Sequence, residues 1–155
     1  LEAVYGEPAA EVRDHRRVVV LTPRGRPFTD AVARELAEEP EVALLCGRYE
    51  GFDERVHRVL ANDEICLGPF VLAGGEVAAM AVIDAVARRL EGALGNAESL
   101  VAESFSEALE GRVEHPHYTR PARFGGHGVP DVLLSGDHGA IARWRDERTV
   151  EPRTA

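Results

Sequence analysis

The stretch LCGRYEGFDERV, Leu45–Val56, joins two predicted elements of the fold. It begins inside the apolar run Val42–Cys46, which predicts a buried strand that Gly47 ends. It finishes inside Phe52–Leu60, which predicts a short helix. The glycines between them lack a Cβ atom, so backbone N–H and C=O groups there can approach a ligand. A strand, an open loop and a helix in this order predict one unit of an α/β fold with a ligand loop at the strand end.

The same alternation continues on both sides of this stretch. Val18–Leu21 predicts a strand stopped by Pro23 and Gly25, and Thr29 can cap a helix over Asp30–Glu39. Further predicted elements are the strand Glu64–Leu67, the extended piece Phe70–Leu72, the helix Glu76–Leu90, the strand Val132–Leu134 and the helix His138–Glu147. This order predicts an α/β fold, with a parallel sheet and helices on both faces. We expect residues 1–155 to form a single domain whose two ends look cut.

Composition excludes several classes of function. All 18 basic residues are Arg, so a phosphate loop ending in Lys and Schiff-base chemistry are excluded. The net charge is −9 and the acidic excess lies in residues 1–111, so only a local Arg cluster could contact a phosphate backbone. Cys46 and Cys66 read as buried structural residues. With no long apolar run and no leader, we expect a cytoplasmic protein without a membrane partner.

Three loops rich in Gly and Pro follow predicted strands, at Leu21–Gly25, Cys46–Val56 and Leu67–Glu76. Ligands of open α/β sheets bind beyond the carboxyl ends of strands, so these loops predict a ligand site. None has the glycine spacing of a dinucleotide-binding fold, and ordinary turns remain the alternative. We read His57 as part of a solvated helix face. His115 and His117 are too few to predict a metal site, and we expect none.

Four segments of the chain are long enough to compare with known families. They resemble the bacterial tRNA (guanine-N1)-methyltransferase family, TrmD. The segments are LCGRYEGFDERV (Leu45–Val56), EICLGPFVLAGGEVAAM (Glu64–Met80), HPHYTRP (His115–Pro121) and VPDVLLSGDH (Val129–His138). The resemblance runs from about Val18 to the end of the chain.

The resemblance implies a SPOUT fold, in which the C-terminal part of the sheet is tied into a deep trefoil knot. It implies that S-adenosylmethionine binds bent between the three loops, and that magnesium supports activity. The product would be 1-methylguanosine on the 3′ side of the tRNA anticodon. Partners would be tRNA and a second copy of the chain, with active sites at the dimer interface. The family's first strand and its C-terminal helical, tRNA-binding domain are absent from these 155 residues.

Carried over by position, the resemblance implies a set of cofactor-binding residues on the three loops. These are Leu21, Thr22, Pro23, Gly47, Tyr49, Glu50, Gly51, Leu67, Gly68, Phe70, Leu72, Gly74 and Gly75. Apolar side chains with open glycine backbone suit adenine, and Glu50 or Tyr49 could line the sulfonium.

The resemblance also implies the groups that act on the substrate. Methyl transfer to a ring nitrogen that carries hydrogen needs a proton acceptor and a cation near the neighbouring carbonyl oxygen. The family uses Asp and Arg, which here are Glu103 and Arg88. His117, Tyr118 and Arg120 match a segment close to the substrate. Glu103 is a departure from the family pattern because Glu is one methylene longer than Asp, and a solvated surface acid is its alternative reading.

Three other departures lie in or just after the cofactor loops. Thr22 stands where the resemblance implies Ser, Arg24 where it implies Gln and Ala78 where it implies Pro. Three functions therefore remain open. The first is a tRNA guanine-N1 methyltransferase, supported by the intact loops with Arg88, Tyr118 and Arg120. The second is a noncatalytic knotted dimer that binds S-adenosylmethionine, supported by the acidic charge, the expected lack of the tRNA-binding domain and Glu103. The third is a methyltransferase for a small substrate on the same scaffold.

Overall fold

The computed structural model describes residues 1–93 and 103–152. The chain divides into two compact units, Leu1–Leu94 (unit 1) and Gly95–Ala155 (unit 2).

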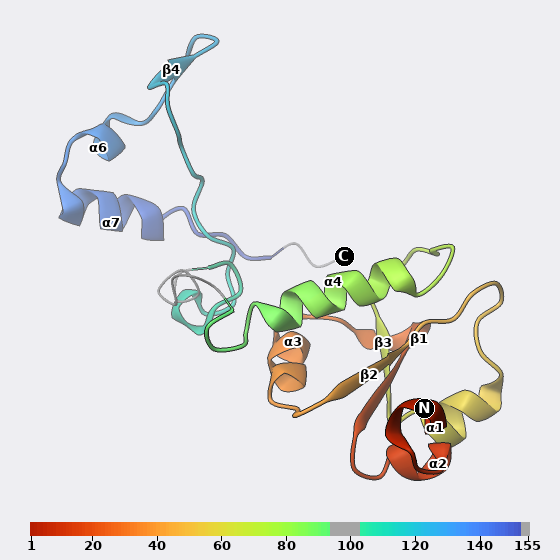
Figure 1. Ribbon diagram of the computed structural model, residues 1–155. Helices are drawn as coiled ribbons and strands as arrows, with labels where there is room; N and C mark the ends of the chain where they lie inside the picture. The colour runs from red at the N-terminus through yellow and green to blue at the C-terminus, as the bar shows by residue number, and fades with distance from the viewer. Residues whose placement is uncertain (94–102, 153–155) are drawn as a thin grey trace. The chain divides into compact units, whose positions relative to one another are not determined.

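Unit 1 is built on a three-stranded parallel sheet (Figure 1). Its strands are β1 (Arg17–Pro27), β2 (Val42–Leu45) and β3 (Asp63–Cys66), in the order β2-β1-β3. Val19 of β1 pairs with Leu44 on one side and with Asp63 on the other. The predicted parallel sheet is confirmed, and the predicted strands at 42–46 and 64–67 lie within one residue of the observed ones.

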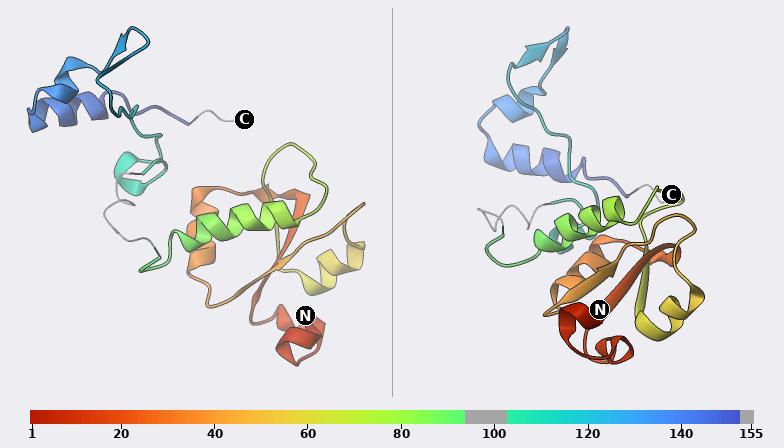
Figure 2. Two further views of the ribbon diagram at one scale, coloured as in Figure 1. Left: turned by 45° about the horizontal axis from the view of Figure 1, so that its top comes forward. Right: turned by 45° about the vertical axis from the view of Figure 1, so that its right-hand side comes forward.

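Helices cover both faces of this sheet. α3 (Asp30–Ala37) and α4 (Glu76–Ala87) lie on one face, and α2 (Ala9–Val12) lies with the π-helical turn η1 (Val56–Leu60) on the other (Figure 2). A further turn of helix, α1 (Glu2–Tyr5), precedes α2. Because β1 is covered on both faces, its successive valines at 18–20 are all fully buried. A continuous apolar run therefore marks the centre of the fold.

The core between the sheet and α3 and α4 follows from helical spacing. Val19 and Ile65 of the sheet pack with Val32, Leu36 and Val82. α3 begins where the Thr29 side chain accepts a hydrogen bond from the Val32 N–H at 3.4 Å, as its N-cap position predicts. α4 buries Ala78, Ala79 and Val82. The core lies directly behind the loops that leave the sheet.

The expectation that β1 stops at Pro23 and Gly25 is wrong. Leu21 and Arg26 both pair with Ile65, so residues 22–25 leave the strand and return to it; we call them the β1 excursion. A Cβ atom on Gly25 would lie closer than 3.0 Å to the backbone of Ile65, which only glycine avoids. The glycine that reads as a strand stop is thus the residue that lets the strand resume.

The segments around η1 and before α4 also differ from expectation. The predicted helix Phe52–Leu60 is shorter, because the Asp53 carboxylate accepts a hydrogen bond from the Arg55 N–H at 2.8 Å and starts the helical turn only after Asp53. Residues 68–70 form a bend, and residues 71 and 72 belong to no strand. The segment before η1 is thus part of the loop after β2, and the segment before α4 is part of the loop after β3.

Unit 2 contains short elements. They are η2 (Glu107–Leu109), the two-residue strands β4 (Arg123–Phe124) and β5 (His127–Gly128), α6 (Asp131–Leu134) and α7 (His138–Asp146). α7 agrees with the prediction to within one residue and is capped by the Asp137 carboxylate, which accepts from the Ala140 N–H at 2.9 Å. The predicted strand Val132–Leu134 is wrong, since Pro130 and Asp131 start a helix there. A run of three apolar residues is compatible with both a strand and a helix, so it cannot predict which one forms.

Within residues 1–93 and 103–152, none of the helices has the length and apolar character needed to cross a membrane.

Candidate functional site

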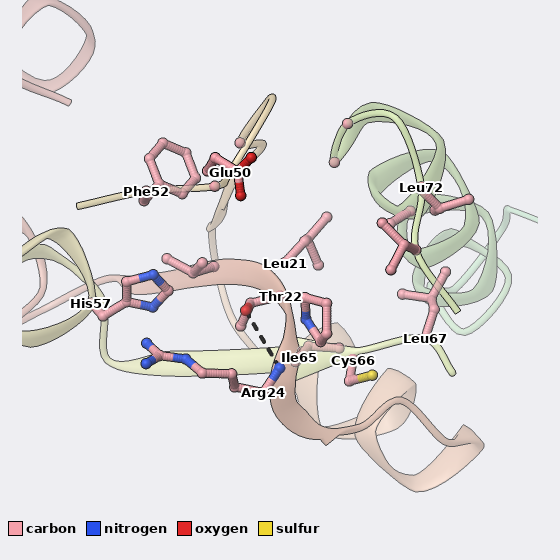
Figure 3. A pocket seen from close by; sticks show the side chains of 18 of the residues that line it. Leu21, Thr22, Arg24, Glu50, Phe52, His57, Ile65, Cys66, Leu67 and Leu72 are labelled. Atoms are coloured by element: carbon pink, nitrogen blue, oxygen red, sulfur yellow. Dashed lines mark hydrogen bonds between the residues drawn. The ribbon is translucent and has the colours of Figure 1, made fainter. Parts of the chain in front are cut away.

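A cavity of about 500 Å³ lies where the three strands of unit 1 end (Figure 3). Its walls come from the β1 excursion, the loop after β2 and the loop after β3. The structure brings all the predicted cofactor-loop residues together on this lining: Leu21, Thr22, Pro23, Gly47, Tyr49, Glu50, Gly51, Leu67, Gly68, Phe70, Leu72, Gly74 and Gly75. The size lies within the range of about 300–1,000 Å³ that is usual for small-molecule sites.

The loops after β2 and β3 are held against each other by a backbone hydrogen bond and a side-chain ion pair. The Gly75 N–H donates to the Gly47 carbonyl at 2.9 Å, and Nε of Arg48 donates to Oε1 of Glu76 at 2.7 Å. A Cβ atom on Gly75 would lie 2.8 Å from Cα of Cys46, so this close packing requires glycine. The two loops therefore act as one wall of the cavity.

The β1 excursion is anchored by charge at its return point. Arg26 donates to Oδ2 of Asp63 and to Oε2 of Glu35, each at 2.7 Å. The hydrogen bond from Arg26 lowers the pKa of the Glu35 carboxyl from its ordinary value. Since Asp63 lies on β3 and Glu35 on α3, Arg26 ties the end of the excursion to two elements of the core.

One end of the cavity is apolar and is formed by Leu67, Phe70 and Leu72. A Cβ atom on Gly68 would lie 2.6 Å from the Phe70 ring, so glycine allows that ring to fold back over the loop. The thiol of Cys66 lies 3.3 Å from the Gly68 carbonyl oxygen. This apolar end, with its glycine backbone, has the chemistry that a nucleobase needs.

The other end is polar and was missed by the sequence analysis. It contains Arg24, Glu54 and His57; Nη1 of Arg24 lies 3.0 Å from Oε2 of Glu54. The interpretation of His57 as solvated is wrong, because its side chain is 7% exposed and its Nδ1 lies 3.1 Å from Oε1 of Glu64. The available signal was the position of Glu54 and His57, one helical turn apart immediately after the ligand loop. We call these three residues the polar end.

Tyr49 and Glu50 lie on the lining but face water. Tyr49 is 99% exposed and has a φ of 57°, a left-handed conformation that turns the chain sharply. Glu50 is also exposed. Contact of either side chain with a sulfonium stays a prediction.

Cys46 behaves as a structural residue. Burial, with a smaller effect of the Glu76 charge, raises the pKa of its thiol. A raised pKa keeps the sulfur protonated and poorly nucleophilic.

The two predicted catalytic residues belong to different units. Arg88 is the C-cap of α4 in unit 1, and its N–H donates to the Asp84 carbonyl at 3.1 Å. Glu103 opens the described part of unit 2, where its carbonyl accepts from the Ser106 N–H at 3.0 Å. Their joint action on one substrate stays a prediction.

The predicted substrate residues His117, Tyr118 and Arg120 line a second cavity, of about 440 Å³, within unit 2. Nε2 of His117 lies 3.0 Å from Oε2 of Glu114. The Tyr118 ring meets the Trp144 ring edge-to-face, with 6.1 Å between centroids. Arg145 of α7 lies on the same lining. An aromatic ring beside two guanidiniums is suited to stacking with a base and pairing with a phosphate.

The described residues contain no group of three or more His, Cys, Asp and Glu side chains arranged to hold a metal ion.

A cavity lined by glycine at the carboxyl ends of parallel strands defines an α/β protein that binds a ligand at its strand ends. The family described as tRNA (Guanine-1)-methyltransferase TrmD matches residues 3–155. The chain belongs to this family.

Individual relatives agree with that assignment. A tRNA (guanine-N(1)-)-methyltransferase of Sorangium cellulosum is 62% identical over 143 residues, which cover 92% of this chain and 53% of that protein. A protein with the same description from Geobacter metallireducens is 52% identical over 97% of this chain. Another, from a Synechococcus species, is 56% identical over 95% of this chain. These alignments cover 58% and 59% of the two proteins, so the chain spans little more than half the length of these relatives.

Proposed function

We propose that the chain transfers a methyl group from S-adenosylmethionine to N1 of the guanosine on the 3′ side of the tRNA anticodon. The observation that carries the proposal is the single cavity that unites every cofactor residue expected from the motifs. The relatives are described as tRNA (guanine-N(1)-)-methyltransferases. Their description does not favour the alternative of a dimer that binds S-adenosylmethionine without catalysis. A tRNA substrate implies a cytoplasmic location.

The cavity residues fit the methyl donor. Leu67 and Leu72 would contact the adenine, and the open backbone at Gly68 and Gly75 would meet its polar edge. When bound, S-adenosylmethionine supplies an electrophilic methyl group next to a positively charged sulfur. The residues of the chain hold this ligand and position the methyl group.

In this proposal Glu103 accepts the proton from N1 of the guanine. Arg88 stabilises the negative charge that grows on the neighbouring carbonyl oxygen. Both residues act only when they meet at one substrate.

Arg120 and Tyr118 would hold the tRNA through a phosphate and a base. The proposal includes the deep trefoil knot and a homodimer with active sites at its interface. Val77, Met80 and Ile83, three residues apart on α4, are 63%, 69% and 56% exposed. Such an apolar stripe on a helix supports a protein contact there.

The test is transfer of labelled methyl from S-adenosylmethionine to unmodified tRNA by the 155-residue chain. We expect label at guanine N1, reduced at least about 100-fold by Arg88→Ala and by Glu103→Gln, because each removes a charge that acts on the transition state. Glu107→Gln, four residues beyond Glu103 in the sequence, is the matched control and should retain transfer.

Binding of S-adenosylmethionine without any transfer would refute the proposed activity and support the noncatalytic alternative. Undiminished transfer by Glu103→Gln would refute its role as proton acceptor.

A further inference from the structure

The polar end of the cavity carries a pair of opposite charges to which nothing above gives a role. Arg24 lies on the β1 excursion, and Glu54 lies just before η1. Figure 3 shows Arg24 and His57 at one end of the cavity and Leu67 and Leu72 at the other, with Leu21 and Thr22 between them. A ligand that places a nucleobase at the apolar end therefore extends toward these charges.

We propose that the polar end binds the zwitterionic α-amino-acid group of the adenosyl ligand, with Arg24 receiving its carboxylate. This inference rests on the proposed function, and it adds Arg24 as a specificity residue of the cavity.

Charge supports Arg24 as the recognition group. Among the described residues that line the cavity, Arg24 is the only Arg. Its ion pair with Glu54 uses Nη1, whereas a guanidinium carries five N–H donors in a planar fork that matches a carboxylate. The pair with Glu54 therefore holds Arg24 in place and leaves donors for the ligand.

The acidic side chains of the same lining complement the ammonium group. Glu50 and Glu54 both line the cavity, and Figure 3 places Glu50 on the side of Phe52 and His57. Glu54 also accepts from Nε of Arg58 at 3.2 Å, so two guanidiniums share its charge. The positive charge of Arg24 is thus only partly offset, which favours a carboxylate beside it.

The guanidinium of Arg24 offers a carboxylate a charge-assisted, two-point contact, whereas the amide of a Gln at this position would be neutral. Arg24 should therefore make the cavity selective for ligands that retain the amino-acid carboxylate.

The test compares two adenosyl ligands by calorimetric titration of the 155-residue chain. S-adenosylhomocysteine carries the amino-acid group, and 5′-methylthioadenosine lacks it. We expect Arg24→Gln to weaken S-adenosylhomocysteine about tenfold and to change 5′-methylthioadenosine less than twofold, because a charged hydrogen bond is lost only for the first. Arg24→Lys should restore part of the affinity.

Arg55→Gln is the matched control. Arg55 pairs with Asp53 rather than with Glu54 and does not line the cavity, and its side chain is 86% exposed. Both ligands should bind this variant as they bind the unchanged chain.

Three outcomes would overturn the inference. Unchanged S-adenosylhomocysteine affinity in Arg24→Gln would show that no carboxylate contact exists. An equal loss for both ligands would show that Arg24 acts only through loop shape. If the unchanged chain bound neither ligand, the cofactor site of the proposed function would fail as well.

Discussion

Unit 1 and unit 2 differ in how much of their structure is buried. Every buried apolar side chain that the structure describes lies in unit 1, between Val12 and Val82, and in residues 103–152 the one buried residue is Ser106. Unit 1 holds a cavity at the ends of a packed sheet, whereas unit 2 holds one among exposed aromatic and basic side chains. Substitutions should therefore change folding stability mostly in unit 1 and substrate contact mostly in unit 2.

The largest expected difference between the units concerns leucine packing. Leu36 is 1% exposed in the core of unit 1, and Leu134 of α6 is 60% exposed. Leu36→Ala should lower the free energy of unfolding by about 2–5 kcal/mol, because it leaves a cavity. Leu134→Ala should change it by about 0.5 kcal/mol or less. Urea denaturation followed by circular dichroism measures both, and equal losses would break the comparison.

Glycine substitutions should sharpen the comparison with effects of opposite sign. Gly25→Ala would push a Cβ atom against the backbone of Ile65 and should cost about 1–3 kcal/mol. Gly139 lies in α7, where an added Cβ would make ordinary contacts from 3.4 Å outward. Gly139→Ala should stabilise by about 0.5 kcal/mol through helix propensity. Melting temperatures that move in the same direction for both variants would contradict this.

The smallest expected effect is the pH dependence of the charge network in unit 1. Arg26 holds the pKa of Glu35 below its ordinary value of 4.5 in the folded chain. A lowered pKa adds stability above about pH 4.5, and this stability is lost as the pH falls through the folded value. The urea midpoint of the unchanged chain should therefore fall more steeply from pH 5 to pH 3 than that of Glu35→Gln.

Arg26→Gln should flatten the same slope, because the lowered pKa depends on the guanidinium. Parallel curves for the three proteins would show that the contact adds nothing to folding. Glu35 is partly exposed, so solvent screening keeps the difference small.

Local sequence predicts the parts of this fold that are decided locally. The strands at Val42 and Glu64 and the helices at Asp30 and His138 lie close to the predicted positions, because caps and apolar runs determine them. The return of β1 at Arg26 depends on Asp63, 37 residues further along the chain, so no local pattern could reveal it. The run Val132–Leu134 is too short to indicate its own structure.

The candidate site divides in the same way. The motifs identified the glycine loops, and the structure places all of their predicted residues around one cavity. The predicted cofactor residues come from the family motifs, and these residues do not include Arg24, Glu54 or His57. His57 was also interpreted as part of a solvated helix face. Only the packing of η1 against the strand ends reveals that His57 belongs to the cavity.

The β1 excursion has a consequence for how this protein can change over evolution. Both of its ends pair with one position of the neighbouring strand, Ile65, so the strand register on either side is set without pairing by residues 22–24. Those three positions form a short window that lines the cavity. Substitution there can alter ligand preference while the hydrogen-bond ladder is inherited unchanged, which makes this window a natural place to engineer selectivity for analogues of the methyl donor.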